Sequence, residues 1–97
     1  MKLAMQAQKD YFREKCFTLQ SGQQIVYRLS TAHPIEFNLH HHPSADEVVY
    51  PDKLVVESQH SKQLVAESGG VYCFMAKNLR DQPGTFEVVI NYEITAQ

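Results

Sequence analysis

Several features that mark common functional classes are missing from this sequence. Lysine and arginine form no basic run of the kind that nucleic-acid-binding surfaces need. No apolar stretch approaches the roughly 18–20 residues that cross a membrane as a helix. The chain also lacks a Cys-x-x-Cys motif, a glycine-rich phosphate loop and a nucleophile elbow. We therefore expect no nucleic-acid partner, no membrane span in this chain and no catalytic activity.

The composition is that of one folded domain. Hydrophobic residues make up 43% of the 97 residues, and five tyrosines and five phenylalanines supply large side chains for a core. Chains of this length usually form one domain, and this apolar content argues against disorder. The net charge of −2 is small and mixed in sign, so charge indicates no class of partner.

Apolar and polar residues alternate along much of the chain, which predicts β-strands. In the clearest case, residues 85–95, Phe86 and Ile90 belong to an apolar parity, and polar residues fill most of the other parity. A period of two over this length indicates a half-buried strand. Residues 25–30 and 35–40 alternate in the same way.

Turn residues separate these strands. Pro51-Asp52 lies between two β-branched runs, and we predict a turn there; Gly69-Gly70 and the pair at 83–84 mark two further breaks. Seven or eight short strands without a later helix predict an all-β antiparallel sandwich, either immunoglobulin-like or jelly-roll-like. The expected core consists of the inward positions Phe17, Leu19, Ile25, Tyr27, Leu29, Ile35, Phe37, Leu39, Tyr72, Phe74, Phe86, Val88, Ile90 and Tyr92.

The first residues contain no apolar segment of the length found in an export signal. We predict that residues 1–14 form a polar lead-in, either flexible or with a helical turn, because chain termini are often loose. The sandwich domain is then expected to occupy residues 15–97.

Three consecutive histidines follow one of the alternating runs. If that strand continues, His40 and His42 point outward together with Glu36 and Asn38, whereas His41 points inward. The three imidazoles therefore cannot bind one ion together unless the strand ends first.

A metal site at this position would use His40 and His42, and imidazole ligands suit zinc or copper. The third donor would come from His33, His60, Asp46 or Met75. The alternative is the polar rim of a hairpin, which binds no metal.

The two cysteines leave the redox compartment open. An even number of cysteines in a small all-β domain fits a disulfide between Cys16 and Cys73 in an oxidising compartment. Two buried thiols in a reducing cytosol are the alternative, because free cysteine packs as a small hydrophobic residue. A blue-copper centre is not expected, since no histidine follows Cys73.

One predicted strand is apolar on both faces. Val71, Cys73 and Met75 alternate with Tyr72 and Phe74. Either this is a central strand whose outer face is covered by another segment, or its first parity forms an exposed patch that docks a partner.

The stretch "GVYCFMAKN" resembles the G-x-Y-x-F-x-x-x-N strand of the GOLD domain, the Golgi-dynamics β-sandwich of cargo-receptor proteins. Gly70, Tyr72, Phe74 and Asn78 occupy the matching positions. The stretches "CFTLQSGQQIVYRL", "IEFNLHHHPSADEVVY" and "FEVVINYEI" resemble other strands of that family, so the likeness extends over residues 16–94. The resemblance implies a β-sandwich that acts as an interaction module.

The family's secretory members carry the second cysteine of a disulfide two positions later in this strand, where this chain has Met75. Cys73 keeps the same parity, so the resemblance leaves a bridge from Cys16 open.

The sequence thus predicts a noncatalytic protein-interaction or ligand-binding module that is periplasmic, secreted or lumenal rather than cytoplasmic. Its expected binding surface comprises Glu36, Asn38, His40, His42, Val71, Cys73 and Met75. The competing hypothesis is an extracytoplasmic copper- or zinc-binding protein that uses His40 and His42.

Overall fold

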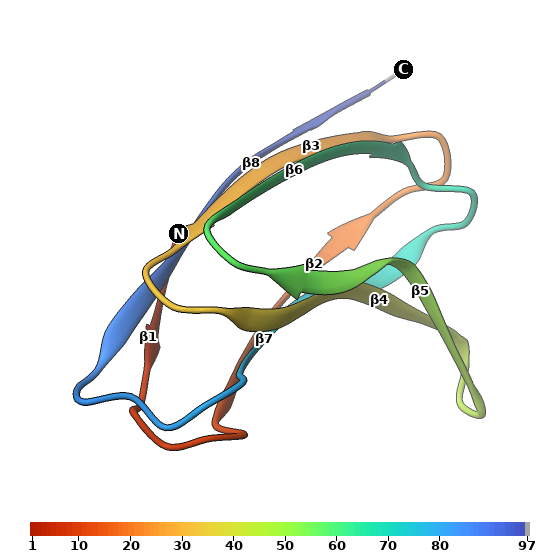
Figure 1. The fold of residues 1–97 in the computed structure, drawn as a ribbon. Helices are drawn as coiled ribbons and strands as arrows, with labels where there is room; N and C mark the ends of the chain where they lie inside the picture. Colours follow the sequence, from red (N-terminus) through yellow and green to blue (C-terminus); the bar gives the residue numbers. More distant parts are fainter. Residues whose placement is uncertain (97) are drawn as a thin grey trace.

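Two four-stranded antiparallel sheets face each other in the computed structural model, which describes residues 1–96 (Figure 1). The strands are β1 (Lys2–Met5), β2 (Phe12–Leu19), β3 (Gln24–Thr31), β4 (Ile35–Ser44), β5 (Glu47–Val56), β6 (Gln59–Val65), β7 (Gly70–Asn78) and β8 (Phe86–Thr95). The predicted all-β sandwich is confirmed, and its predicted end at residue 97 lies outside the described residues. Within 1–96, no helix is long and apolar enough to cross a membrane.

The strand order divides the chain between two layers. One sheet has the order β2-β7-β4-β5 and contains both cysteines, so we call it the cystine sheet. The other, which we call the opposite sheet, has the order β1-β8-β3-β6. Figure 1 shows the two layers and the hairpin of β4 and β5, whose turn projects away from the sandwich.

The predicted alternation builds the core between the sheets. Every residue of the expected core is buried except Phe17, which is half-buried, and Tyr92, which is 39% exposed. Tyr92 does face inward, because its ring centre lies 5.7 Å from those of Phe17 and Phe74. The prediction that Tyr92 is buried is wrong. The strand that covers its ring is β2, which carries Phe17 and lies at the edge of its sheet, so one side of Tyr92 remains exposed.

The N-terminal residues form a strand, so the flexible or helical lead-in predicted over residues 1–14 is wrong. Lys2–Met5 pair with β8 and bury Leu3 and Met5 in the core. Strand β2 already begins at Phe12, so most of residues 1–14 belong to strands of the sandwich or to the connection between β1 and β2. The alternating pattern of β1 covers only four residues, which is too few to distinguish a strand from a helical turn by its period.

Asn78 fixes the connection between β1 and β2. Its side chain is fully buried, and Nδ2 donates to the carbonyl oxygens of Ala7 and Gln8 at 3.1 Å each. Its backbone N–H donates to the Tyr11 carbonyl and its own carbonyl accepts from the Asp10 N–H, both at 2.8 Å. These bonds satisfy a buried amide and hold the short strand β1 in place.

Strands β4 and β5 form one long hairpin, so the turn predicted at Pro51-Asp52 is wrong. The two strands contribute different numbers of residues between successive pairs on either side of His41. Two register shifts absorb this difference, so the strands stay paired. β5 is an edge strand, where a proline without an N–H is tolerated. The chain reverses instead at residues 45–46.

A buried polar contact joins the two sheets. Tyr27 on β3 donates its hydroxyl proton to Asp52 on β5, and Nε2 of His60 on β6 lies 2.8 Å from the same carboxylate oxygen. Burial raises the pKa of Tyr27 well above its ordinary value of 10.0, and the hydrogen bond and charge of Asp52 add to this. The Asp52 carboxylate thus finds both partners on the opposite sheet, which fixes β5 over β3.

Replacing Leu3 by alanine should lower the free energy of unfolding by about 2 kcal/mol, because the buried side chain leaves a cavity. The matched Lys2→Ala variant, whose side chain is exposed on the same strand, should change it by less than about 0.5 kcal/mol. Urea denaturation measures both. Equal small effects would contradict a core role for β1.

Tyr27 should make the protein lose stability at alkaline pH. The unfolded tyrosine releases its proton near its ordinary pKa of 10.0, whereas the folded one retains it. Its contribution is therefore complete below that pKa and declines as the pH rises above it, by up to about 1.4 kcal/mol per pH unit.

Urea denaturation of the Tyr27→Phe variant should show a smaller loss of stability above about pH 10 than the parent chain does. The exposed Tyr50→Phe variant is the control and should keep the parent slope. Identical slopes for the parent and the Tyr27 variant would show that Tyr27 has no such role.

Candidate interaction face

The outer face of the cystine sheet gathers the residues that the sequence singles out, and we call it the cystine face. Strand alternation and register place its side chains in rows across neighbouring strands. These rows are Phe12–Lys77–Glu36–Val55, Glu14–Met75–Asn38–Lys53, Cys16–Cys73–His40 and Thr18–Val71. Segments from both halves of the sequence therefore meet on one surface.

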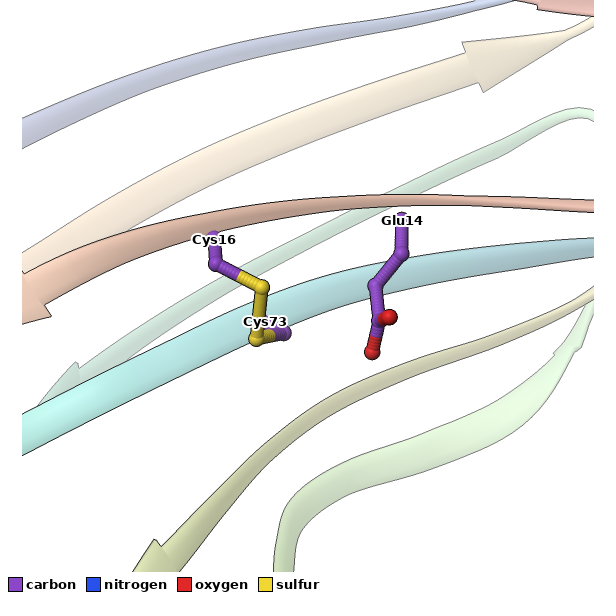
Figure 2. A group of neighbouring side chains, drawn as sticks. All are labelled: Glu14, Cys16 and Cys73. Atoms are coloured by element: carbon purple, nitrogen blue, oxygen red, sulfur yellow. A yellow bond between two sulfur atoms is a disulfide. The ribbon is translucent and has the colours of Figure 1, made fainter.

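Cys16 and Cys73 form a disulfide between edge strand β2 and its neighbour β7 (Figure 2). The two residues are direct partners in the ladder, with their Cα atoms 4.0 Å apart. Cys16 is exposed, whereas Cys73 is only 5% exposed. Of the two alternatives that the sequence leaves open, the structure shows the bonded pair.

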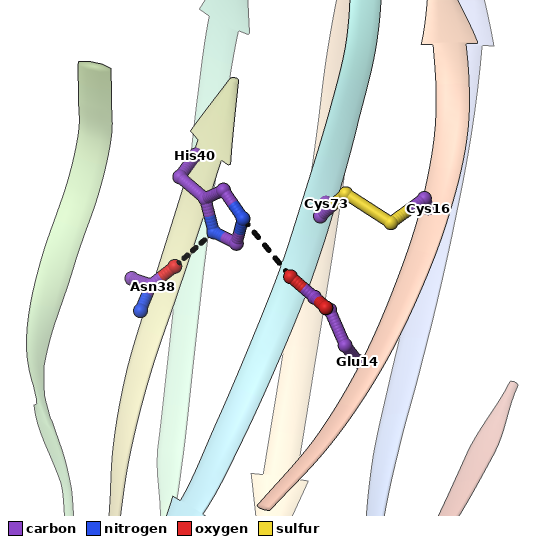
Figure 3. Close-up of a disulfide and its surroundings, with 5 residues drawn as sticks. All are labelled: Glu14, Cys16, Asn38, His40 and Cys73. Carbon is purple, nitrogen blue, oxygen red and sulfur yellow. Dashed lines mark hydrogen bonds and ion pairs between the residues drawn. A yellow bond between two sulfur atoms is a disulfide. The ribbon is translucent and has the colours of Figure 1, made fainter. Parts of the chain in front are cut away.

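His40 links β4 to β2 across the intervening strand β7. Its Nε2 lies 3.0 Å from Oε1 of Glu14, and its Nδ1 lies 2.7 Å from Oδ1 of Asn38 (Figure 3). Both partner atoms are acceptor oxygens, so a ring nitrogen that carries a proton donates to the oxygen it faces. These three residues form a fixed polar centre beside the disulfide.

All seven residues of the predicted binding surface lie on the cystine face, but their access to solvent differs. His42 and Val71 are exposed, and Glu36 and Met75 are partly exposed. The remaining three are buried, namely Asn38, His40 and Cys73. Asn38 and His40 therefore form a covered centre instead of an accessible rim; they contact each other, and His40 also contacts Glu14.

The two histidines of the metal hypothesis lie close together, with ring centres 5.5 Å apart. Both nitrogens of His40 are already engaged, so a metal at His40 and His42 would have to displace one contact. Two of the suggested third donors do not lie beside these histidines. His33 packs against Phe86, and His60 contacts Asp52 between the sheets. His41 points inward, as predicted, and stacks on a core tyrosine.

Lys77 on this face is paired with two carboxylates, one in the β1–β2 connection and one on β4. Nζ of Lys77 lies 3.6 Å from Oδ1 of Asp10 and 3.9 Å from Oε2 of Glu36. Such partly exposed pairs contribute little stability. They leave the face without a strong charge of one sign.

Exposed apolar side chains border the polar centre. Phe12, Tyr50, Val55 and Val71 are each 48–56% exposed. Strand parity places Phe12 and Val71 on the side of the disulfide, and Nζ of Lys53 covers the Tyr50 ring at 4.7 Å. The cystine face therefore has an apolar border around a polar centre that is already hydrogen-bonded.

The sequence-based prediction of the surface omits Phe12, Glu14, Tyr50 and Val55. Phe12 and Glu14 fall in the segment predicted to be a lead-in, and Tyr50 falls beside the predicted turn. A signal was present for the first two, because Phe12 and Glu14 share the parity of Cys16 in "FREKCF".

Two hollows lie away from the cystine face. A shallow one of about 580 Å³ covers the outside of the opposite sheet, where Val26 and Glu93 line it. A cleft of about 380 Å³ lies at one end of the sandwich, where Val49 and Val65 face His41. Each hollow contains an exposed valine that can serve as a control for Val71 on the cystine face.

No protein-family model and no curated protein matches this chain. The resemblance to the GOLD domain therefore stays a prediction, and the function is argued from the geometry of the cystine face.

Replacing both cysteines by alanine should lower the free energy of unfolding by about 4 kcal/mol. A disulfide over a sequence separation of 57 residues removes loop entropy of this size from the unfolded chain. The control pair Thr18→Ala with Val71→Ala, adjacent in the same ladder, should cost less than about 1 kcal/mol. Guanidinium denaturation under nonreducing conditions measures both, and equal costs would contradict a stabilising disulfide.

Proposed function

We propose that this protein is a noncatalytic interaction module that docks a protein partner on the cystine face. The observation that carries the proposal is the apolar border of Phe12, Tyr50, Val55 and Val71 around the polar centre. Aromatic side chains contribute most of the binding free energy in many protein interfaces, and polar groups contribute specificity.

The cystine face is preformed, which favours docking over induced ordering. The disulfide holds β2 against β7, and the contacts of His40 hold β4 to β2. A partner would therefore bind without first ordering these strands, and less binding free energy is lost to conformational entropy.

The polar groups at the centre are engaged with one another, which supports a binding role over catalysis. Glu14 and Asn38 occupy both nitrogens of His40, so this imidazole has no ring nitrogen left for a substrate proton. In a docked complex the exposed Glu14 carboxylate would present an acceptor to the partner, held in place by its contact with the buried His40.

The disulfide supports a periplasmic, secreted or lumenal location, because such bonds persist in oxidising compartments. The resemblance to the GOLD domain of cargo receptors agrees with this assignment and with an interaction role.

A second candidate is a copper- or zinc-binding protein that uses His40 and His42, which is favoured by the 5.5 Å between their ring centres. It requires His40 to give up its contact with Glu14 or Asn38. The His42→Ala variant described in the next subsection tests this candidate directly.

Three exposed valines allow a matched test of the docking surface. Val71 is on the cystine face, Val65 lines the end cleft and Val26 lies on the opposite sheet, with exposures of 54%, 44% and 42%. Each would be replaced in turn by a photoreactive phenylalanine analogue in the chain produced in its native cells. We expect a discrete protein adduct from the Val71 position and none from the other two.

The adduct should disappear in a chain that also carries Phe12→Asp, since a buried charge opposes docking, while circular dichroism confirms the sheet structure. An adduct from Val65 or Val26 instead of Val71 would place the interface elsewhere. No adduct from any position would contradict an interaction function.

A further inference from the structure

The disulfide lies within a group of metal-ligand atoms. A carboxylate oxygen of Glu14 and the sulfur atoms of Cys16 and Cys73 all lie within 4.8 Å of one another (Figure 2). The residues occupy adjacent rows of β2 and β7 on the same face. Glu14 and Cys16 are exposed, so an ion could approach from solvent.

His40, on the next strand, lies outside this group of three but contacts its carboxylate member. It is the ladder neighbour of Cys73, and its Nε2 lies 3.0 Å from Oε1 of Glu14 (Figure 3). Nitrogen and oxygen ligands of a tetrahedral zinc ion lie roughly 3.3 Å apart, given bond lengths of about 2.0–2.1 Å. The spacing of these two atoms is therefore already close to that of a zinc site.

We propose that reduction of the Cys16–Cys73 bond converts this cluster into a binding site for a thiophilic divalent cation such as zinc. Its ligands are the two thiolates and the Glu14 carboxylate, and Nε2 of His40 completes the set when the side chains rearrange after reduction. Cysteine, histidine and glutamate are the ligand types that zinc takes in proteins. Cation binding requires no protein partner, so its test can succeed or fail whatever the outcome for the proposed docking function.

The reduction is written with a dithiol as the reductant. The dithiol transfers two electrons and two protons to the disulfide, which becomes two thiols, while the dithiol becomes its own cyclic disulfide. When the cation binds, the two thiols and the Nε2 nitrogen release their protons to solvent. The sulfur atoms then need to separate to roughly 3.8 Å, which follows from zinc–sulfur bonds of about 2.3 Å.

The ladder can hold the ligands after the bond opens. Eight register pairs join β2 to β7, from Phe12 opposite Lys77 to Leu19 opposite Gly70. The two strands also keep their core side chains Leu19, Tyr72 and Phe74, which are buried independently of the disulfide. The reduced chain should therefore keep its sheets and present both thiols on one face.

The test uses the full chain, reduced by a dithiol that is then removed without oxygen, and titrated with cobalt(II) as the probe. We expect one cobalt per chain with a thiolate-to-cobalt charge-transfer band, and zinc should displace the cobalt. The oxidised chain should show no such band. Cys16→Ser should abolish the band, and Glu14→Gln should weaken cobalt binding at least about tenfold.

His42→Ala is the matched control, because His42 lies on the same face but outside the ligand set, and it should bind cobalt as the parent does. Loss of binding in His42→Ala, with binding retained in Cys16→Ser, would overturn the proposal in favour of the two-histidine site. Absence of the band in a reduced chain that keeps its sheet spectrum would overturn it as well. So would loss of the sheet spectrum on reduction, because the ladder would then not hold the ligands.

Discussion

Edge strand β2 pairs with one neighbour in its sheet, β7, and the Cys16–Cys73 bond is the covalent constraint that reinforces this ladder. β2 brings Glu14 to His40 and places Phe12 at the apolar border. If β2 moved away, the imidazole would lose its carboxylate partner and the border would lose one side. The same bond therefore stabilises the fold, orders the proposed docking surface and masks the proposed metal ligands.

The sequence predicted the architecture well where alternation is long and one face is buried, as in β3, β4 and β8. It failed where the local signal is short or ambiguous. Four residues of β1 do not establish a period, although Leu3 and Met5 are core residues. Pro51 resembles a turn signal, but an edge strand with shifted register accommodates it. The Tyr27–Asp52 contact was invisible for the same reason, because Asp52 was placed in that turn.

Parity also predicted which residues share a face within each strand. It correctly grouped Asn38 with His40, and Cys73 with Met75, but it could not show that these groups are neighbours. That adjacency follows from the pairing of β4 with β7, a long-range contact that no local pattern encodes. The burial of His40 depends in turn on Glu14, which belongs to a strand segment that the prediction missed. Pairing of the cysteines depends on the β2–β7 register, which sequence spacing cannot supply.

The most direct test is a nonreducing tryptic map of the protein isolated from its native compartment, with accessible thiols alkylated first. Cleavage after lysine and arginine should release peptide 16–28 covalently joined to peptide 63–77, and reduction should separate the two. Recovery of both peptides as separate alkylated species before reduction would contradict the account, because β2 would then be held by hydrogen bonds alone.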